Sequence, residues 1–236
     1  MPSSSKLEIV DRFFSGTGSS YDRMVVLGTC GFDRYWKRRM LARIPKRPTS
    51  IIDQACGTGI VTMEIARRYP DCQVTGVELR DEYLQHARQK AQALGRTNVH
   101  FVLGRAEDVV LEGPSDCITS SYLAKYADLP LLIENAAKML RPGGVMVLHD
   151  FTYPRHPLTR WGWRLYFGIL TLIGKRLAPE WSTVFDELPS LLRETAWVSE
   201  SEVLLRESGF CDIATESLTF GAAAIVTGRM PASSPS

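Results

Sequence analysis

The chain contains the stretch Ser50-Ile-Ile-Asp-Gln-Ala-Cys-Gly-Thr-Gly-Ile-Val61, in which two isoleucines precede a pair of closely spaced glycines. The isoleucines predict a short buried strand, and the apolar residues after the second glycine predict a helix. Gly57 and Gly59 permit a tight turn and let backbone N–H groups approach a ligand closely. A strand, a glycine loop and a helix in this order form a cofactor site at the edge of a parallel sheet.

The residues around this loop distinguish between cofactors. A dinucleotide site requires a third glycine three residues after Gly59, and Thr62 stands there. Asp53 would repel a phosphate at the strand end, but it suits a ligand that carries an ammonium and a sulfonium. The pattern Asp-x-Ala-Cys-Gly-Thr-Gly at residues 53–59 resembles the first motif of class I S-adenosylmethionine (SAM) methyltransferases. A purely structural strand–helix turn is the alternative interpretation.

An acidic residue follows at the spacing that ribose binding requires. The segment Gln73-Val-Thr-Gly-Val-Glu78 predicts a second strand whose last residue is twenty positions beyond Thr58. In α/β nucleotide folds a carboxylate at this place accepts hydrogen bonds from ribose hydroxyls. A solvated glutamate at a strand end is the alternative. Ribose binding by Glu78 does not separate SAM from NAD, because both cofactors carry ribose.

Later segments favour SAM. Met139-Leu-Arg-Pro-Gly-Gly144 predicts a helix end and a turn before a buried strand at 145–150, and this turn accompanies the loop motif in SAM methyltransferases. Strands at 210–218 and 222–227 predict the antiparallel hairpin with which those enzymes end. The predicted fold is therefore an α/β, Rossmann-like seven-stranded sheet of the class I methyltransferase type, with the last strand antiparallel and helices on both faces.

Composition limits the function classes. The 236 residues carry 44% hydrophobic and 23% charged residues, as expected for a globular protein, and a net charge of +2 predicts no nucleic-acid partner. The five cysteines show no metal-ligand spacing, so no metal site is expected. The start lacks a signal-peptide pattern, which favours the cytoplasm. Three parts are predicted: an N-terminal helical lid segment (1–48), the SAM-binding domain (49–229) with a helical insertion or lid (155–195), and a disordered tail (230–236).

The N-terminal part adds a more specific resemblance. Ser20-Tyr-Asp-Arg-Met24 and Gly31-Phe-Asp-Arg-Tyr-Trp-Lys37 are similar to the N-terminus of the ubiquinone/menaquinone biosynthesis C-methyltransferase family. The resemblance covers about residues 10 to 228 and is weakest between 155 and 195. It implies methyl transfer from SAM to an apolar prenylated aromatic of the (demethyl)menaquinol or ubiquinol type.

Three positions depart from the family pattern. Ile60 and Arg105 stand where the family usually has acidic or amide residues, and Lys125-Tyr126 replaces an Arg-Asn pair. Arg105 cannot accept a hydrogen bond from the adenine amino group, so backbone groups of Ala106 or the Glu107 carboxylate would have to substitute. The departures leave open O- or N-methylation of another small molecule, or a non-catalytic SAM-fold binding protein.

The resemblance and the loop pattern together assign a cofactor site. The predicted SAM contacts are Asp53, Ala55, Gly57, Thr58, Gly59, Glu78, Leu79, Arg105, Ala106, Glu107 and Ser121.

The acceptor side requires a general base, because an aromatic hydroxyl gains nucleophilicity when it loses its proton. His149 is the first candidate: it ends the fifth strand beside Asp150 and titrates near neutral pH when unperturbed. A structural, hydrogen-bonded histidine is the alternative. Tyr21 and Tyr122 are candidates for orienting the acceptor.

Two segments have a composition that could allow contact with a membrane surface. Residues 157–176 are apolar, contain tryptophan and are flanked by arginines, which suits an interfacial helix, a lid, or a helix packed on the sheet. The basic helix expected at 33–42 is either a solvated face or a weak lipid contact. Peripheral contact with the inner membrane surface and a homodimer both stay open.

Overall fold

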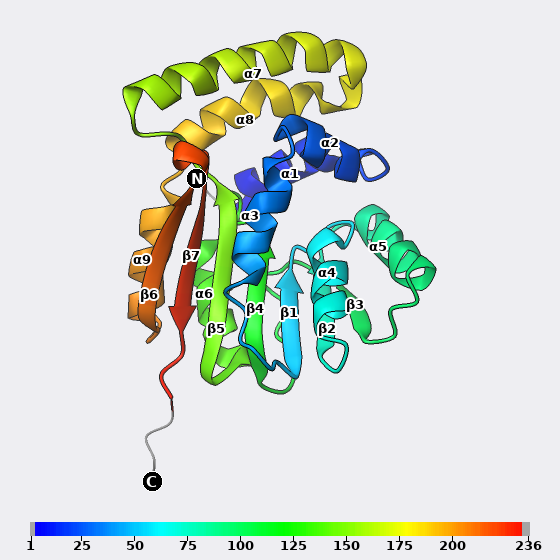
Figure 1. The fold of residues 1–236 in the computed structure, drawn as a ribbon, viewed down its shortest axis with the longest axis vertical. Coiled ribbons are helices and arrows are strands. Elements are labelled where there is room, and N and C mark those ends of the chain that lie inside the picture. Colours follow the sequence, from blue (N-terminus) through cyan, green and yellow to red (C-terminus); the bar gives the residue numbers. More distant parts are fainter. Residues whose placement is uncertain (1–2, 233–236) are drawn as a thin grey trace.

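The computed structural model describes residues 3–232, which form a seven-stranded sheet in the order β3-β2-β1-β4-β5-β7-β6 (Figure 1). Neighbouring strands from β3 through β5 are parallel, and β7 runs antiparallel to both β5 and β6. The strands are β1 (Ser50–Gln54), β2 (Gln73–Glu78), β3 (Val99–Leu103), β4 (Ser115–Ser121), β5 (Leu140–Phe151), β6 (Cys211–Leu218) and β7 (Ala223–Arg229). The predicted fold class is confirmed.

Helices cover both faces of the sheet. They are α1 (Ser3–Phe14), α2 (Tyr21–Gly28), α3 (Phe32–Leu41), α4 (Ile60–Arg68), α5 (Asp81–Ala93), α6 (Leu129–Met139), α7 (Pro157–Leu177), α8 (Ser182–Glu194) and α9 (Trp197–Glu207). Alternate strand residues divide between two cores: Ile52 and Ile118 pack with α6 and α9, whereas Ile51 and Cys117 pack with α3 and α4. This alternation follows from the two-residue period of a strand that is buried on both faces.

The ends of several elements differ from the sequence expectation. The helix α2 was not predicted, and β5 begins at Leu140 rather than at residue 145. The Gly-Gly turn lies inside the irregular start of β5, where Gly143 has a φ of 76° and the pairing with β4 shifts register. Met230, placed in the predicted disordered tail, exchanges backbone hydrogen bonds with Gly143 and Gly144. Residues 233–236 of that tail lie outside the described residues.

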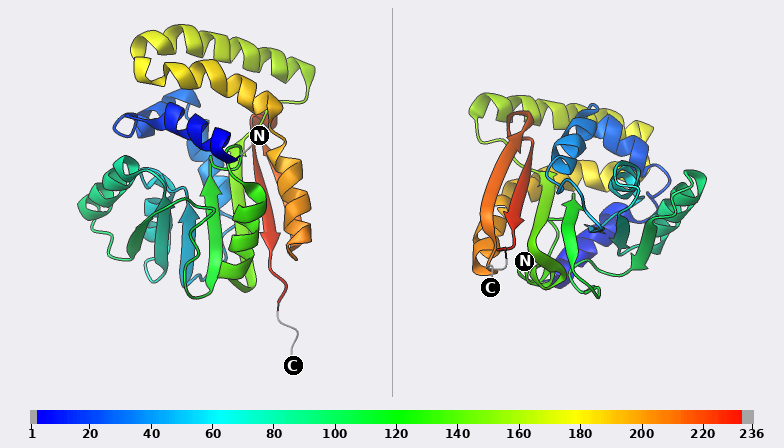
Figure 2. Two further views of the ribbon diagram at one scale, coloured as in Figure 1. Left: turned by 180° about the vertical axis from the view of Figure 1, so that it is seen from behind. Right: turned by 60° about the horizontal axis from the view of Figure 1, so that its bottom comes forward.

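The helices α1 and α2 lie over the end of the sheet where the parallel strands finish, α3 packs against one face of the sheet, and α7 and α8 form an antiparallel pair beyond α1 and α2 (Figures 1 and 2). Contacts to α5 fix this segment: Thr17 Oγ1 bonds Tyr83 Oη at 2.6 Å, and Glu82 accepts the N–H groups of Gly16 and Gly18. Among residues 3–232, no helix is long and apolar enough to cross a membrane.

Part of the basic charge expected at 33–42 is neutralised by acidic partners. Lys37 is buried against Asp33, with 2.8 Å between Nζ and Oδ1. Arg39, and Arg43 just beyond the helix, both pair with Glu216 of β6. These three cations are engaged within the fold, whereas Arg34 and Arg38 are exposed on α3.

Close packing of α7 on α8 predicts a measurable difference between two glycines. A Cβ at Gly174 would overlap the ring of Phe185, whereas one at Gly168 would meet nothing within 4 Å. We expect Gly174→Ala to lower the free energy of unfolding by about 1–3 kcal/mol, because the rigid ring must shift. Gly168→Ala should raise it by up to about 1 kcal/mol through helix propensity. Urea unfolding measures both, and equal destabilisation by the two variants would contradict the packing argument.

Candidate active site

The glycine loop after β1 has the strained backbone that a close ligand approach requires. Ala55, Gly57 and Gly59 all have positive φ values, of 52°, 59° and 80°. The carboxylate of Glu78, at the end of β2, accepts the N–H of Gly57 at 2.9 Å and that of Arg80 at 2.9 Å. Glu78 is 8% exposed, and burial raises its pKa. The loop and the carboxylate are thus fixed to each other before any ligand arrives.

A pocket, here called the loop pocket, opens beside this carboxylate. Eight of the residues that the sequence assigned to SAM line it: Ala55, Gly57, Glu78, Leu79, Arg105, Ala106, Glu107 and Ser121. They come from the ends of β1, β2 and β4 and from the turn after β3, which parallel topology brings to one edge. Glu107 does not have a free carboxylate, because its Oε1 accepts from Asp128 N and from Arg105.

Three other predicted contacts do not line the loop pocket. Asp53 is 1% exposed and accepts hydrogen bonds from Thr62 Oγ1 (2.6 Å) and Thr119 Oγ1 (2.9 Å), and burial raises its pKa to about 6. Thr58 donates to Asp22 of α2, and Gly59 is the N-terminal cap of α4. These residues hold the loop in place, so direct ligand contact by Asp53 and Thr58 is not supported. Periodicity could not show which way these side chains point.

Sequence reasoning missed part of the loop pocket. Its remaining lining comes from α1, from the start of α2, from the start of α5 and from the turn after β4: Lys6, Leu7, Val10, Phe14, Tyr21, Arg80, Tyr83, Tyr122, Leu123 and Tyr126. Of these, only Tyr21 and Tyr122 were singled out from the sequence as acceptor candidates. The α1 residues precede the glycine loop by more than forty positions. No local pattern connects segments that only the tertiary fold places side by side.

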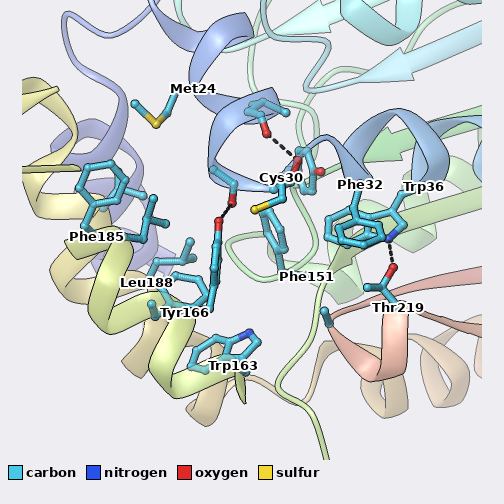
Figure 3. A pocket seen from close by; sticks show the side chains of 18 of the residues that line it. Met24, Cys30, Phe32, Trp36, Phe151, Trp163, Tyr166, Phe185, Leu188 and Thr219 are labelled. Carbon is cyan, nitrogen blue, oxygen red and sulfur yellow. Dashed lines mark hydrogen bonds between the residues drawn. The ribbon is translucent and has the colours of Figure 1, made fainter. Parts of the chain in front are cut away.

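A second and larger cavity, the aromatic cavity, lies between α2, α3 and the α7–α8 pair (Figure 3). Its volume is about 360 Å³, and Figure 3 shows Phe32, Trp36, Phe151, Trp163 and Tyr166 around it. Among the described residues that line it, Lys125 is the one with a charged side chain. Such a lining suits a large apolar, aromatic ligand with a single polar contact.

The two cavities share a wall of four aromatic residues. Phe14, Tyr21, Tyr122 and Tyr126 line both of them. The two cavities are therefore adjacent, with these four side chains between them. Tyr21, assigned to the acceptor from the sequence, lies at the junction.

Tyr122 is held in an unusual backbone conformation at this wall. Its φ is 67°, which is rare for a bulky residue and marks functional sites. Its hydroxyl donates to Asp33 Oδ1 at 2.7 Å, and its ring stacks on Phe151 with 4.6 Å between centroids. Burial raises the pKa of both Tyr21 and Tyr122 well above the usual value. Both phenols are therefore neutral near pH 7, and both rings form part of the wall.

A buried ion pair stands at the inner end of the aromatic cavity. Lys125 Nζ lies 2.6 Å from Asp150 Oδ1 and donates to the carbonyl of Tyr122 at 2.8 Å, and the two side chains are 2% and 0% exposed. The ring of Tyr126 lies under the ammonium at 4.3 Å. Burial lowers the pKa of Lys125 and raises that of Asp150, and the pairing opposes both shifts. An ammonium has three donors, so one can serve a ligand in the cavity.

His149, the base candidate from the sequence, does not line either cavity. It is fully buried, and its Nδ1 lies 3.0 Å from Ser121 Oγ, between the rings of Tyr122 and Trp36. Successive residues of β5 point to opposite faces, so Asp150 reaches the ion pair while His149 turns into the α3 side of the sheet. Its position favours the structural alternative over a base that touches the acceptor.

Burial of His149 predicts a pH-dependent stability term. Burial lowers the pKa of His149 to about 3, against about 6.5 in an unfolded chain. Below pH 6.5 this histidine is therefore protonated in the unfolded chain but stays neutral in the folded protein. The free energy of unfolding consequently falls as the pH decreases. Between pH 7 and pH 5 the loss from this group is about 2 kcal/mol.

His149→Gln should remove that loss, as measured by urea unfolding at the two pH values. The carboxyl of Asp53 has its pKa raised to about 6, so it contributes in the opposite direction over the same range. It does so in both proteins, and its effect cancels in the comparison. Identical pH dependence of the variant and the parent would show that His149 titrates normally.

Comparison with known proteins decides the family. The model of the ubiE/COQ5 methyltransferase family matches residues 3–230. The chain belongs to the ubiE/COQ5 methyltransferase family. The demethylmenaquinone methyltransferase of Roseiflexus castenholzii is 30% identical over 231 residues, covering 96% of this chain and 95% of that protein. The ubiquinone/menaquinone biosynthesis C-methyltransferase UbiE of Geotalea daltonii is 28% identical over 232 residues, covering 95% of this chain and 97% of that protein.

Solved structures show the same fold at low sequence identity. The Haemonchus contortus phosphoethanolamine N-methyltransferase 2 in complex with SAM gives a TM-score of 0.62 at 16% identity, covering 85% of this chain and 53% of that one. The YcgJ protein of Bacillus subtilis gives 0.58 at 16% identity, covering 84% of this chain and 99% of that one. These two structures support the class I fold alone. With the family established, the chain is a SAM-dependent methyltransferase.

The loop pocket fits SAM by the chemistry of its residues. A carboxylate that two backbone N–H groups orient can accept from a pair of ribose hydroxyls. The backbone at Ala55 and Gly57 would face the amino-acid part of the cofactor, and Ala106 with Leu79 would offer an apolar edge for the purine. The shared aromatic wall then lies between the cofactor and the aromatic cavity.

Proposed function

We propose that this methyltransferase transfers the methyl group of SAM to a ring carbon of a prenylated hydroquinone. One observation carries the proposal: the aromatic cavity, with its single lining cation, shares the wall Phe14, Tyr21, Tyr122 and Tyr126 with the loop pocket. The printed names of the relatives, demethylmenaquinone methyltransferase and UbiE, agree with an acceptor of this class.

The residues of the chain position the acceptor rather than attack it. When bound, SAM supplies an electrophilic methyl group on a sulfonium, so the protein needs no covalent nucleophile. The rings of Phe151, Tyr122 and Tyr126 would hold the hydroquinone in the cavity and exclude water. Exclusion of water protects the sulfonium and strengthens the electrostatic contacts that remain.

The ion pair of Lys125 and Asp150 would activate the acceptor. A hydroxyl beside the Lys125 ammonium releases its proton to water more easily as the acceptor binds, because the positive charge stabilises the phenolate. The phenolate donates electron density to the ring carbons next to its oxygen. One of these carbons would take the methyl group, with S-adenosylhomocysteine as the leaving group, and would then lose its ring proton to water so that the ring regains its aromaticity. Asp150 holds the ammonium in place through the 2.6 Å contact. This assignment replaces His149 as the group that acts on the acceptor proton.

The identity of the acceptor is tested by incubating the protein with labelled SAM and a panel of candidate acceptors, with the quinols kept in their reduced form. We expect transfer to a short-tailed naphthoquinol or benzoquinol that lacks one ring methyl group, with the label on a ring carbon in the product NMR spectrum. Phosphoethanolamine and small water-soluble phenols serve as controls and should receive no label. Label on oxygen or nitrogen of the small controls, with none on the quinols, would overturn the proposed function.

A further inference from the structure

We propose that the outer face of α7, the helix that roofs the aromatic cavity, is a docking surface for an anionic lipid bilayer. This inference deepens the proposed function, because a prenylated acceptor dissolves in the bilayer. It stands on the exposure and charge of α7, and not on the identity of the acceptor.

The outer face of α7 is a continuous apolar stripe with no cover among the described residues. Its members recur every three or four positions and are about half to four-fifths exposed: Leu158, Trp161, Leu165, Ile169, Leu172, Ile173 and Leu177. The opposite face packs on α8 through Trp163, Phe167 and Leu170. Figures 1 and 2 show α7 as the outermost element of the molecule, with α8 beneath it. An apolar stripe of this extent marks an interaction surface.

The charge of α7 complements an anionic lipid surface. Arg155 and Arg176 are exposed at the two ends of the stripe and Arg164 is exposed within it, whereas Lys175 pairs with Asp186 of α8. The sequence from 155 to 177 contains no acidic residue. Trp161 stands near the first end, as indole side chains do at membrane interfaces. An apolar face with basic flanks is the composition of a helix that lies in the plane of the headgroups.

The aromatic cavity lies beneath α7, against the helix face opposite to this stripe, where Trp163, Phe167 and Leu170 line it. Gly162 lines the cavity, is exposed and directly follows Trp161. Phe32 and Phe220, which also line the cavity, are 47% and 84% exposed, and Phe220 has a φ of 55°. Tyr166 of α7 donates to the carbonyl of Gly28 at 2.5 Å, so α7 and α2 meet beside the cavity. The cavity therefore reaches the surface beside α7, at the exposed rings of Phe32 and Phe220.

A second copy of the chain is the competing occupant, and charge argues against it. Two α7 helices packed face to face would bring together basic flanks with no acidic residue on either helix. Like charges at an interface oppose association. An anionic bilayer neutralises the same flanks, so the lipid surface is the better complement.

The test measures vesicle binding directly, without acceptor or SAM. Parent protein and a Leu165→Glu/Ile169→Glu variant are sedimented with vesicles of phosphatidylcholine and phosphatidylglycerol. We expect the partition coefficient of the double variant to fall at least tenfold, because two carboxylates replace apolar side chains on the docking face. Val203→Glu, a change of the same kind at a 48% exposed position on α9, should leave binding unchanged. Equal binding by the parent and the double variant would overturn the inference.

A second measurement does not require that the Leu165→Glu/Ile169→Glu variant folds. Brominated phosphatidylcholine quenches tryptophan that enters the bilayer, and Trp161 is 66% exposed on the docking face. Quenching of the parent should be lost in Trp161→Phe, while quenching that persists in this variant would overturn the inference. A dimer that hides α7 and ignores vesicles would also overturn it.

Turnover separates this inference from the proposed function. Leu165 and Ile169 do not line the aromatic cavity, so the double variant should methylate a short-tailed quinol in the absence of vesicles as fast as the parent. Vesicle binding without quinol turnover would remove the proposed acceptor and keep the docking surface. Quinol turnover without vesicle binding would remove the docking surface and keep the proposed acceptor.

Discussion

Replacing Glu78 by alanine is expected to raise the dissociation constant for SAM by at least tenfold. The carboxylate lines the loop pocket and is held by the N–H groups of Gly57 and Arg80. Hydrogen bonds to a charged acceptor contribute about 1.5–3 kcal/mol each, and about 1.4 kcal/mol is a factor of ten in affinity. The variant also leaves the Gly57 N–H without its partner, so the loop itself loosens and the loss should exceed that of one contact.

Isothermal titration calorimetry with SAM measures this effect on the parent and the variant. Glu64→Ala is the matched control, because Glu64 lies on α4, pairs with Arg67 and Arg68, and does not line the loop pocket. The control should bind SAM like the parent. A Glu78→Ala variant that binds with the parent's affinity would place the ribose elsewhere.

Replacing Lys125 by methionine is expected to lower both stability and turnover. The substitution leaves the carboxylate of Asp150 buried at 0% exposure without its cation. Removing one partner of a buried ion pair lowers the free energy of unfolding by about 3–5 kcal/mol. Removing a group that stabilises developing negative charge lowers kcat by about 10²-fold or more. The dissociation constant for SAM should change little, because Lys125 does not line the loop pocket.

A double variant distinguishes the two effects of Lys125. In Lys125→Met/Asp150→Asn no charge is left buried and the amide oxygen can still accept from the backbone N–H groups that Asp150 serves, so most of the lost stability should return while turnover stays low. Lys138→Met is the control: this lysine pairs with Glu134 on the surface of α6, and its loss should change the free energy of unfolding by less than about 1 kcal/mol. Full turnover in the double variant would show that the ion pair is structural.

The sequence by itself determined the sheet and the cofactor edge. Strand periodicity and the glycine loop follow local rules: Gly57 and Gly59 adopt the positive φ values that a tight turn requires. Glu78 ends β2 at the spacing that topology imposes, because parallel strands finish at one edge. These features depend on a few neighbouring residues, so a linear pattern contains them.

The direction in which side chains point at that edge could not be predicted from the sequence. Asp53 and His149 were both assigned to ligands, but Asp53 bonds Thr62 and Thr119, and His149 is buried beside Ser121. A side chain at a strand end points either to the ligand or to the interior, and the next residue along the strand points the other way. Only the packed structure shows which.

The aromatic cavity was decided by tertiary structure alone. Its wall joins Phe14 of α1, Tyr21 of α2 and Tyr126 after β4, and its roof comes from α7 and α8. Residues 157–176 looked equally like a lid, an interfacial helix or a packing helix, because composition does not say which face of a helix is covered. Packing on α8 covers one face and leaves the other apolar and exposed. The physical reason is that a cavity is lined by side chains that are distant in sequence, and no local sequence pattern shows that they lie close together in the fold.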